Sequence, residues 1–180
     1  MNALEPGYTD NKKAVETNPN LTEDEKLTAL NVEDKQLVSS VDKELASVKK
    51  QLASDPTNAK LKEKEANLTK IKSSTENSIA SRDKVLEEKQ LAITPKDRIA
   101  QLNPSYGTKT KEILASSTLS DHEKLTALSK EDGALLTSVN KELSSVKTQL
   151  AKDPSNKSLQ AKETALNQIK SEKEGPSLNG

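Results

Sequence analysis

Residues 21–72 of this chain are written a second time at 119–170, at a constant offset of 98 positions and without a gap. Of the 52 aligned residues, 30 are identical, and a weaker match extends upstream, where Leu4–Tyr8 aligns with Leu102–Tyr106. Self-similarity of this length is the sequence signature of a tandem array. It predicts that one structural unit is built twice.

The duplication suggests where the units begin and end. We expect a complete first unit over residues 3–100 and a second, truncated unit over 101–174. The tail 175–180 does not continue the repeat, and it is interpreted as a native boundary or as the remnant of an expression fusion. The abrupt start and the truncated second copy predict a piece of a longer array.

The composition limits what kind of core the chain can build. Hydrophobic residues make up 31% of the chain and aromatic residues 1%, so a thick globular core is not expected. Thin helical bundles with narrow apolar seams remain possible, and so does disorder. Periodicity decides between them in favour of helices.

The clearest helices are predicted at about 32–54 and about 130–152. Apolar residues recur there every three or four positions, as in one seam of a coiled coil or slim bundle. In the first copy this stripe consists of Leu37, Val41, Leu45, Val48 and Leu52, and in the second of Leu135, Val139, Leu143, Val146 and Leu150.

A short turn is expected after each of these helices, at 54–58 and at 152–156. Asp55 and Asp153 precede a proline, so each is predicted to cap the next helix with proline in its first turn. The chain would then fold back as an antiparallel hairpin, over about 32–92 in the first copy and from about 130 in the second. The polar residues Thr75 and Arg82 interrupt the apolar pattern, which predicts a weakly specified return helix beyond Ile71.

Shorter helices are predicted at about 8–17, 106–116 and 94–102, the last capped by Thr94. Thr22 and Ser120 open capping boxes. Further capping patterns, Asn31-x-x-Asp34 and Ser129-x-x-Asp132, predict helix breaks near 31 and 129. The expected fold is therefore all-α: an elongated tandem repeat of antiparallel, coiled-coil-like hairpins joined by short helices.

No pattern points to catalysis, a cofactor or a metal. His122 is the only histidine and has no partners at ligand spacing, so we expect it on the surface of a first helical turn. Paired carboxylates are assigned to helix first turns, where they offset exposed amide dipoles. These pairs are Glu23-Asp24-Glu25, Glu33-Asp34, Glu87-Glu88 and Glu131-Asp132. The chain is therefore expected to be non-enzymatic, with no catalytic, cofactor-binding or metal-binding residues.

The two tyrosines occupy equivalent places, in Pro6-x-Tyr8 and Pro104-x-Tyr106. One interpretation makes them contact residues for a ligand. The favoured interpretation makes each one a packing residue at the joint between repeats, with its hydroxyl at the surface.

Two resemblances follow from these residues. The five-residue Asp-Pro-Thr/Ser-Asn turn is similar to the inter-helix turn of tetratricopeptide repeats, but the period of 98 departs from the 34 residues of that family, and its peptide-binding groove is not carried over. The large duplicated unit, rich in Lys, Ser, Thr, Asn and Glu, is similar to helical repeat regions of large bacterial surface and cell-envelope proteins. That similarity implies an exported parent with a stalk or adhesive role, and a cytoplasmic location stays open.

Three functions are weighed. The leading one is a structural spacer in a longer array, monomeric and packed on neighbouring repeats of the same chain. The second is a module that binds an unidentified protein through polar residues kept in both copies: Lys43, Glu44, Lys49, Gln51 and Asn58, with Lys141, Glu142, Lys147, Gln149 and Asn156. The third is coiled-coil self-association. The 28 basic and 28 acidic residues cancel, so nucleic acid is not an expected partner. No apolar stretch reaches the ~20 residues of a membrane span, so membrane insertion is not expected either.

Overall fold

A computed structural model describes residues 3–175, and this part of the chain contains seven α-helices and no strand. The prediction of an all-α fold is confirmed. Most of the tail, residues 176–180, lies outside the described residues. The helices are α1 (Tyr8–Thr17), α2 (Glu23–Ser54), α3 (Ala59–Ala92), α4 (Pro95–Leu102), α5 (Tyr106–Ala115), α6 (Asp121–Lys152) and α7 (Lys157–Glu174).

The chain divides into two compact units, the first ending at Leu86 and the second beginning at Glu87. The division falls inside α3, so the last turns of that helix belong to the second unit. It lies ahead of the boundary near residue 100 that the duplication suggests. The helix α4 accordingly packs on α6 and α7, helices of the second unit.

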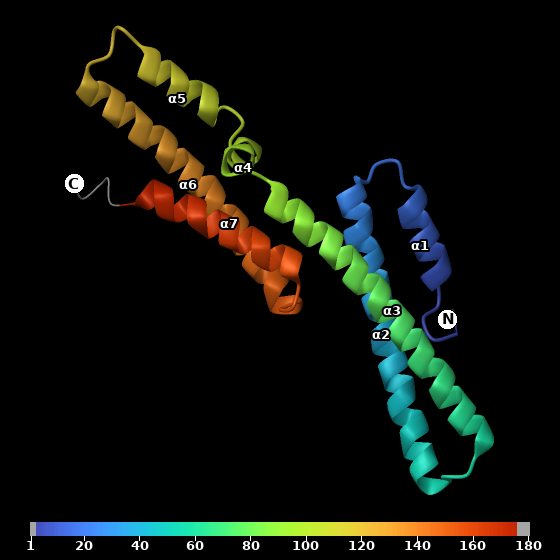
Figure 1. Ribbon diagram of the computed structural model, residues 1–180. Helices are drawn as coiled ribbons and strands as arrows, with labels where there is room; N and C mark the ends of the chain where they lie inside the picture. The colour runs from blue at the N-terminus through green and yellow to red at the C-terminus, as the bar shows by residue number, and fades with distance from the viewer. Residues whose placement is uncertain (1–2, 176–180) are drawn as a thin grey trace. The chain divides into compact units, whose positions relative to one another are not determined.

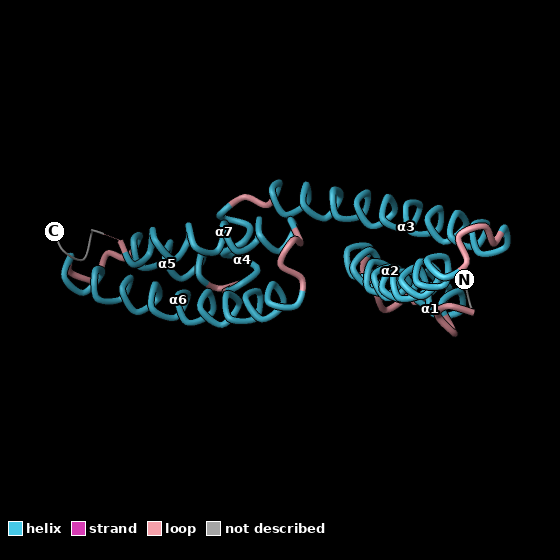
Figure 2. Tube along the Cα trace, turned by 90° about the horizontal axis from the view of Figure 1, so that it is seen from below, coloured by secondary structure: helices cyan, strands magenta, loops and turns pink. Residues whose placement is uncertain are grey.

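The first unit is built on the long helix α2. The short helix α1 lies along its amino-terminal half (Figures 1 and 2). Beyond a short turn, α3 reaches α2 through its side chains, since Leu68 belongs to the core cluster and Lys64 pairs with Glu44. Its core is one cluster of buried residues from α1, α2 and α3, with partly buried residues at its edge. The buried members are Tyr8, Leu37, Val41, Leu45, Val48 and Leu68, and the partly buried ones are Leu4, Leu52, Leu61 and Ile71.

The second unit is built on α6 in the same way. Both α5 and α7 pack along α6, and α4 contacts all three of these helices (Figure 1). Its core has the buried members Leu135, Val139, Leu143, Val146, Leu166 and Ile169, with Ile99, Leu102, Tyr106, Leu150 and Leu159 at its edge. Apart from Ile99, each of these residues lies 98 positions after a member of the first cluster. The duplicated residues therefore serve the same packing role in both units.

The predicted helix breaks near 31 and 129 are wrong, because α2 and α6 each run unbroken for 32 residues. In the first unit, the side chains that looked like caps do not turn back to the local backbone. Asn31 and Asp34 are buried and bond instead to residues of α3. A polar residue that faces a partner helix leaves the backbone of its own helix undisturbed.

The predicted caps after the turns are also wrong. The next helix begins at Ala59 and at Lys157, beyond the proline, and its cap is the asparagine before it. Oδ1 of Asn58 accepts from the amide of Leu61 at 3.1 Å, and Oδ1 of Asn156 accepts from the amide of Leu159 at 3.0 Å. Asp55 supports the cap, since its Oδ2 accepts from Nδ2 of Asn58 at 3.1 Å.

Other local predictions are confirmed. Ser120 and Glu123 form a complete capping box at the start of α6. At the start of α2 only half of the predicted box forms: Thr22 accepts from the amide of Glu25, and the Glu25 carboxylate accepts from the Thr22 hydroxyl. Thr94 caps α4 by accepting from the amide of Asp97 at 3.1 Å. These signals are readable in the sequence because each cap acts on a backbone amide three residues away.

Candidate functional site

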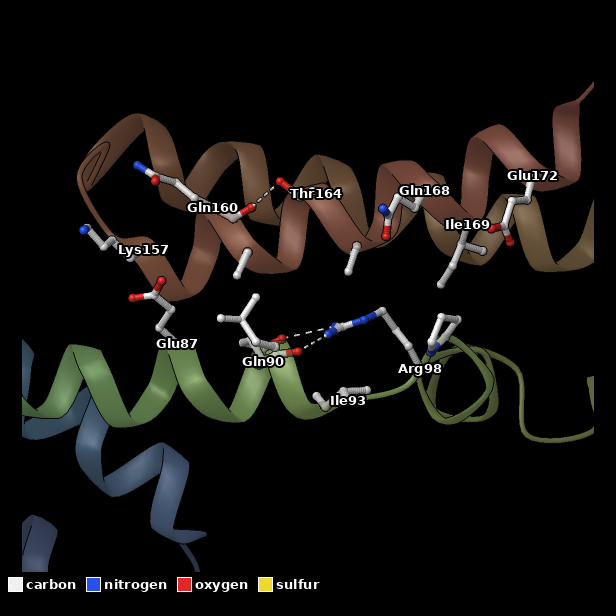
Figure 3. Close-up of a pocket in the computed structure, with 14 residues that line it drawn as sticks. Glu87, Gln90, Ile93, Arg98, Lys157, Gln160, Thr164, Gln168, Ile169 and Glu172 are labelled. Carbon is white, nitrogen blue, oxygen red and sulfur yellow. Dashed lines mark hydrogen bonds between the residues drawn. The ribbon is translucent and has the colours of Figure 1, made fainter.

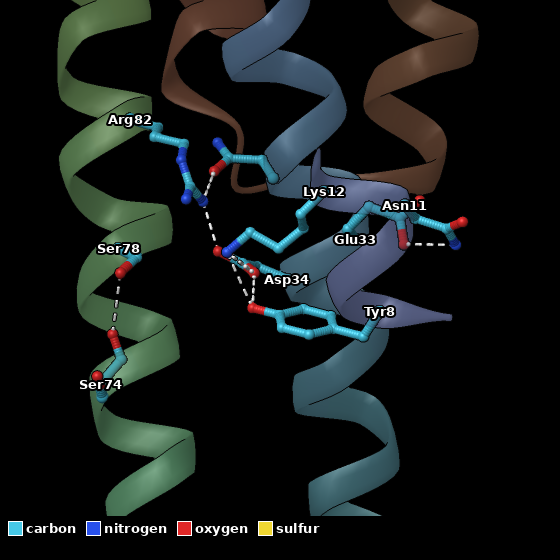
Figure 4. Close-up of polar contacts among 9 residues, drawn as sticks. Tyr8, Asn11, Lys12, Glu33, Asp34, Ser74, Ser78 and Arg82 are labelled. Atoms are coloured by element: carbon cyan, nitrogen blue, oxygen red, sulfur yellow. Dashed lines mark hydrogen bonds and ion pairs between the residues drawn. The ribbon is translucent and has the colours of Figure 1, made fainter. Parts of the chain in front are cut away.

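The most elaborate polar site of the first unit surrounds a carboxylate in the interior. Asp34 on α2 has only 1% of its side chain exposed. The hydroxyl of Tyr8 on α1 donates to its Oδ1 at 2.5 Å, and Arg82 on α3 donates from Nη1 to its Oδ2 at 2.5 Å (Figure 4). One carboxylate thus joins three helices that are distant in sequence.

A second cation completes this cluster. Lys12 lies one turn after Tyr8 on α1, and its Nζ is 3.0 Å from the tyrosine hydroxyl and 3.2 Å from Oδ1 of Asp34 (Figure 4). Nζ also lies 4.9 Å from the centre of the Tyr8 ring. A buried carboxylate is tolerated only when donors and positive charge compensate its desolvation, and here two cations and a hydroxyl do so.

The cluster shifts the pKa values of its members. Burial by itself would raise the pKa of Asp34, but the hydrogen bonds from Arg82, Tyr8 and Lys12 outweigh it and hold this pKa below its usual value. Burial and the bond to Asp34 raise the pKa of Tyr8. Burial lowers the pKa of Lys12, but its bonds to Tyr8 and Asp34 more than reverse this and raise it. At neutral pH the carboxylate is therefore charged and the phenol is neutral.

The second unit repeats the tyrosine–aspartate contact with its cation moved. The hydroxyl of Tyr106 donates to Oδ1 of Asp132 at 2.5 Å, and Nζ of Lys173 lies 5.1 Å from the Tyr106 ring. The position of Lys12 holds Thr110 in this copy. The lysine of the second unit, Lys173, occupies the position equivalent to Thr75. In the first unit Thr75 is buried.

These contacts correct the favoured interpretation of the tyrosines. The Tyr8 hydroxyl does not lie at the surface, because it bonds to a buried carboxylate and the residue is 6% exposed. Tyr8 packs in the core cluster of its own unit. Sequence reasoning missed Asp34 and Arg82 as partners, although both interrupt an apolar seam. The signal in the sequence was that each of two helices expected to pack together has a polar residue at a position of its apolar seam. Such a pair of residues can bond to each other across the seam.

Most polar residues shared by the two copies have partners inside their own unit. Nζ of Lys64 is 2.6 Å from Oε1 of Glu44, and the equivalent pair, Lys162 with Glu142, has the same separation. Gln51 and Gln149 each donate to a serine one turn earlier. Asn58 and Asn156 are the caps described above. The other four candidates are exposed lysines that make no such contact within residues 3–175: Lys43, Lys49, Lys141 and Lys147.

The assignment of the paired carboxylates to first helical turns is confirmed only for Glu23-Asp24-Glu25 at the start of α2. It is wrong for the other three pairs, which lie inside α2, α3 and α6, because these helices run on without a break. His122 is exposed in the first turn of α6, as predicted. Within residues 3–175 no three His, Cys, Asp or Glu side chains gather in a way that could hold a metal ion. Over the same range, none of the helices combines the length and apolar character that crossing a membrane requires.

No protein-family model matches the chain, and neither a curated protein nor a solved structure matches it.

Proposed function

We propose that the chain consists of structural spacer repeats from a longer array. Each repeat would be an antiparallel, coiled-coil-like helical hairpin braced by a shorter helix. The observation that carries this proposal is the reuse of one interior in both units. Ten core positions coincide at the 98-residue offset, as do the tyrosine–aspartate contact and the asparagine cap.

The residues that are identical in the two copies include the buried stripe of the long helix. The buried stripe of α2 from Leu37 to Val48 recurs unchanged in α6, and so does the ion pair between Glu44 and Lys64. These residues act within their own unit. A duplicated module that keeps its interior while its surface changes supplies shape and length, and we infer a non-enzymatic role for it.

The resemblance of the sequence to helical repeats of bacterial surface and cell-envelope proteins supports a role at the cell exterior or in the envelope. There the array would hold another domain away from a surface. Binding of a protein through the exposed lysines common to both copies is the second candidate, since Lys43 and Lys49 are identical to their equivalents and stand exposed in both units.

Small-angle X-ray scattering of the chain at several concentrations tests the spacer role. We expect an elongated particle whose mass equals one chain, 19.5 kDa, at every concentration. A mass that doubles with concentration would favour self-association. A compact monomer would contradict the spacer and direct attention to the exposed lysines.

A further inference from the structure

Arg98 on α4 is a buried cation without an acidic partner. It is 2% exposed, and its Nη1 and Nη2 donate to Oε1 and to the backbone carbonyl of Gln90 at 3.2 and 3.1 Å. Among residues 3–175 its Nε finds no hydrogen-bond partner. Within the described residues no carboxylate pairs with this guanidinium, and burial lowers its pKa.

The bonds to Gln90 compensate Arg98 only in part. They give two of its three nitrogens an acceptor near the end of α3, but both acceptors are neutral. A guanidinium stays charged at any pH that a protein meets, so it cannot relieve its burial by losing a proton. A buried charge that lacks a counter-ion and a buried donor that lacks an acceptor are both unfavourable. An anion at Nε would remedy both.

Arg98 also lines a cavity of about 630 Å³ in the second unit, between the end of α3, α4 and α7 (Figure 3). This volume lies within the range of ligand clefts. Figure 3 shows the Arg98 side chain extending from α4 toward Gln90, with Thr164 and Gln168 on the facing helix α7. The apolar part of the lining consists of Leu91, Ile93, Pro95, Ala161, Ala165 and Ile169.

The first unit provides a comparison for the α7 wall of this cavity. Its equivalent surface on α3 is strongly charged, whereas the middle of the α7 wall is neutral and smaller. Only Ile169 keeps the residue of the first copy, Ile71, among the eight lining residues of α7. The changes in the middle of the wall are Lys62 to Gln160, Glu63 to Ala161, Asn67 to Ala165 and Lys70 to Gln168.

Arg98 therefore lines a hollow whose α7 wall is neutral in its middle and partly apolar. The other charged lining residues are Glu87, Lys157 and Glu172, which carry two negative charges and one positive charge. The amide and hydroxyl groups of Gln160, Thr164 and Gln168 can donate to and accept from the backbone of an extended peptide.

We propose that this cavity binds a peptide through a carboxylate, which accepts hydrogen bonds from the Arg98 guanidinium. Nε is one donor, and Nη1 becomes another when the Gln90 side chain rotates away. The Nη2 bond to the backbone carbonyl stays in place. The carboxylate belongs either to an acidic side chain or to the end of a chain, because a planar guanidinium recognises both alike. This role as a receptor goes beyond that of a spacer.

The chain offers a direct probe of Arg98, because it contains two arginines, Arg82 and Arg98. Each gives its own Nε–Hε signal in a ¹⁵N–¹H correlation spectrum, and the Arg82→Lys variant identifies which is which. Three peptides are titrated: Ac-Ala-Glu-Ala-NH2, Ac-Ala-Gln-Ala-NH2 and Ac-Ala-Ala-Ala with a free carboxyl end. Arg82 is bonded within the first unit and serves as the internal control.

We expect the Arg98 signal to shift in a saturable way with a carboxylate peptide and to stay fixed with the glutamine peptide, while Arg82 does not move. A response to the first peptide alone names an acidic side chain as the ligand group. A response to the third alone names a chain end. No shift, or equal shifts with the glutamine peptide, would overturn the proposal and leave Arg98 as a brace for the end of α3.

The variant Arg98→Lys gives an independent check. It keeps the charge but removes Nε–H and the planar fork, so we expect affinity for the responding peptide to fall about tenfold or more. Circular dichroism establishes whether the variant is folded. If it unfolds, the titration of the wild-type chain still decides the question, because that experiment needs no change at Arg98. Unchanged affinity in a folded variant would contradict the assignment to Arg98.

Discussion

The hydroxyl of Tyr8 donates a 2.5 Å hydrogen bond to Oδ1 of Asp34, 26 residues along the chain, and the same bond recurs between Tyr106 and Asp132. The bond fastens the short helix of each unit to its long helix. It does so around a carboxylate that would be unfavourable in an apolar core without donors. The two copies of this contact allow each substitution to be compared with its equivalent in the same molecule.

Replacing Tyr8 with phenylalanine removes one donor from a buried carboxylate and keeps the ring in the core. We expect the first unit to lose about 1–3 kcal/mol of unfolding free energy, the usual effect of removing one bond to a charged group. Urea-induced unfolding monitored by NMR measures the unfolding free energy of each unit from its own signals. Tyr106→Phe should instead weaken the second unit. A Tyr8→Phe variant as stable as the wild type would show that water replaces the hydroxyl.

The pKa of Asp34 predicts how stability depends on pH. In the unfolded chain an aspartate titrates near 3.9, and in the folded chain this pKa is lower. The folded state therefore holds the proton less tightly, and the stabilisation that is present above pH ~4 is lost as the pH falls through the folded pKa. In Asp34→Asn this loss should be absent from the unfolding curve of the first unit. If the first unit of the variant loses as much stability at low pH as the wild type does, other carboxylates cause the effect.

The lysine beside the tyrosine is at position 12 in the first unit and at position 173, the equivalent of 75, in the second. We therefore expect the effects on stability of substitutions at positions 12 and 75 to be coupled. Lys12→Thr alone should weaken the first unit, and Thr75→Lys alone should place two lysines beside one carboxylate. The double variant reproduces the arrangement of Thr110 and Lys173, so it should recover most of the loss. We expect a coupling free energy of about 0.5–3 kcal/mol in a double-mutant cycle. Additive effects would show that positions 12 and 75 act independently.

Truncation of the shared core tests the packing. Leu45 and Leu143 are 8% and 4% exposed in their clusters, and replacing either with alanine should cost about 2–4 kcal/mol in its own unit. Leu125 is 65% exposed on α6 and is the matched control. Leu125→Ala should change stability by about 0.5 kcal/mol or less. Equal effects of the buried and exposed substitutions would contradict the assigned core.

The elements that depend on residues close together in the chain were predictable from the sequence. Apolar residues at helical spacing identified α2 and α6 and the stripe that each of them buries, because packing on a narrow seam needs only a regular stripe. The caps at Thr22, Thr94 and Ser120 were predictable because the capped amide lies three residues away. The 98-residue offset showed which residues of the two units would play the same part.

The partners of the polar residues in the interior depend instead on how the helices pack. Asn31 and Asp34 look like local caps in the sequence, and only the packing of α3 against α2 gives them Asp83 and Arg82 as partners. Arg98 reads as an ordinary residue of a short helix until the fold buries it beside a cavity. A polar side chain bonds to whatever group comes within about 3 Å. For these residues that group lies on another helix, so the local sequence does not specify it.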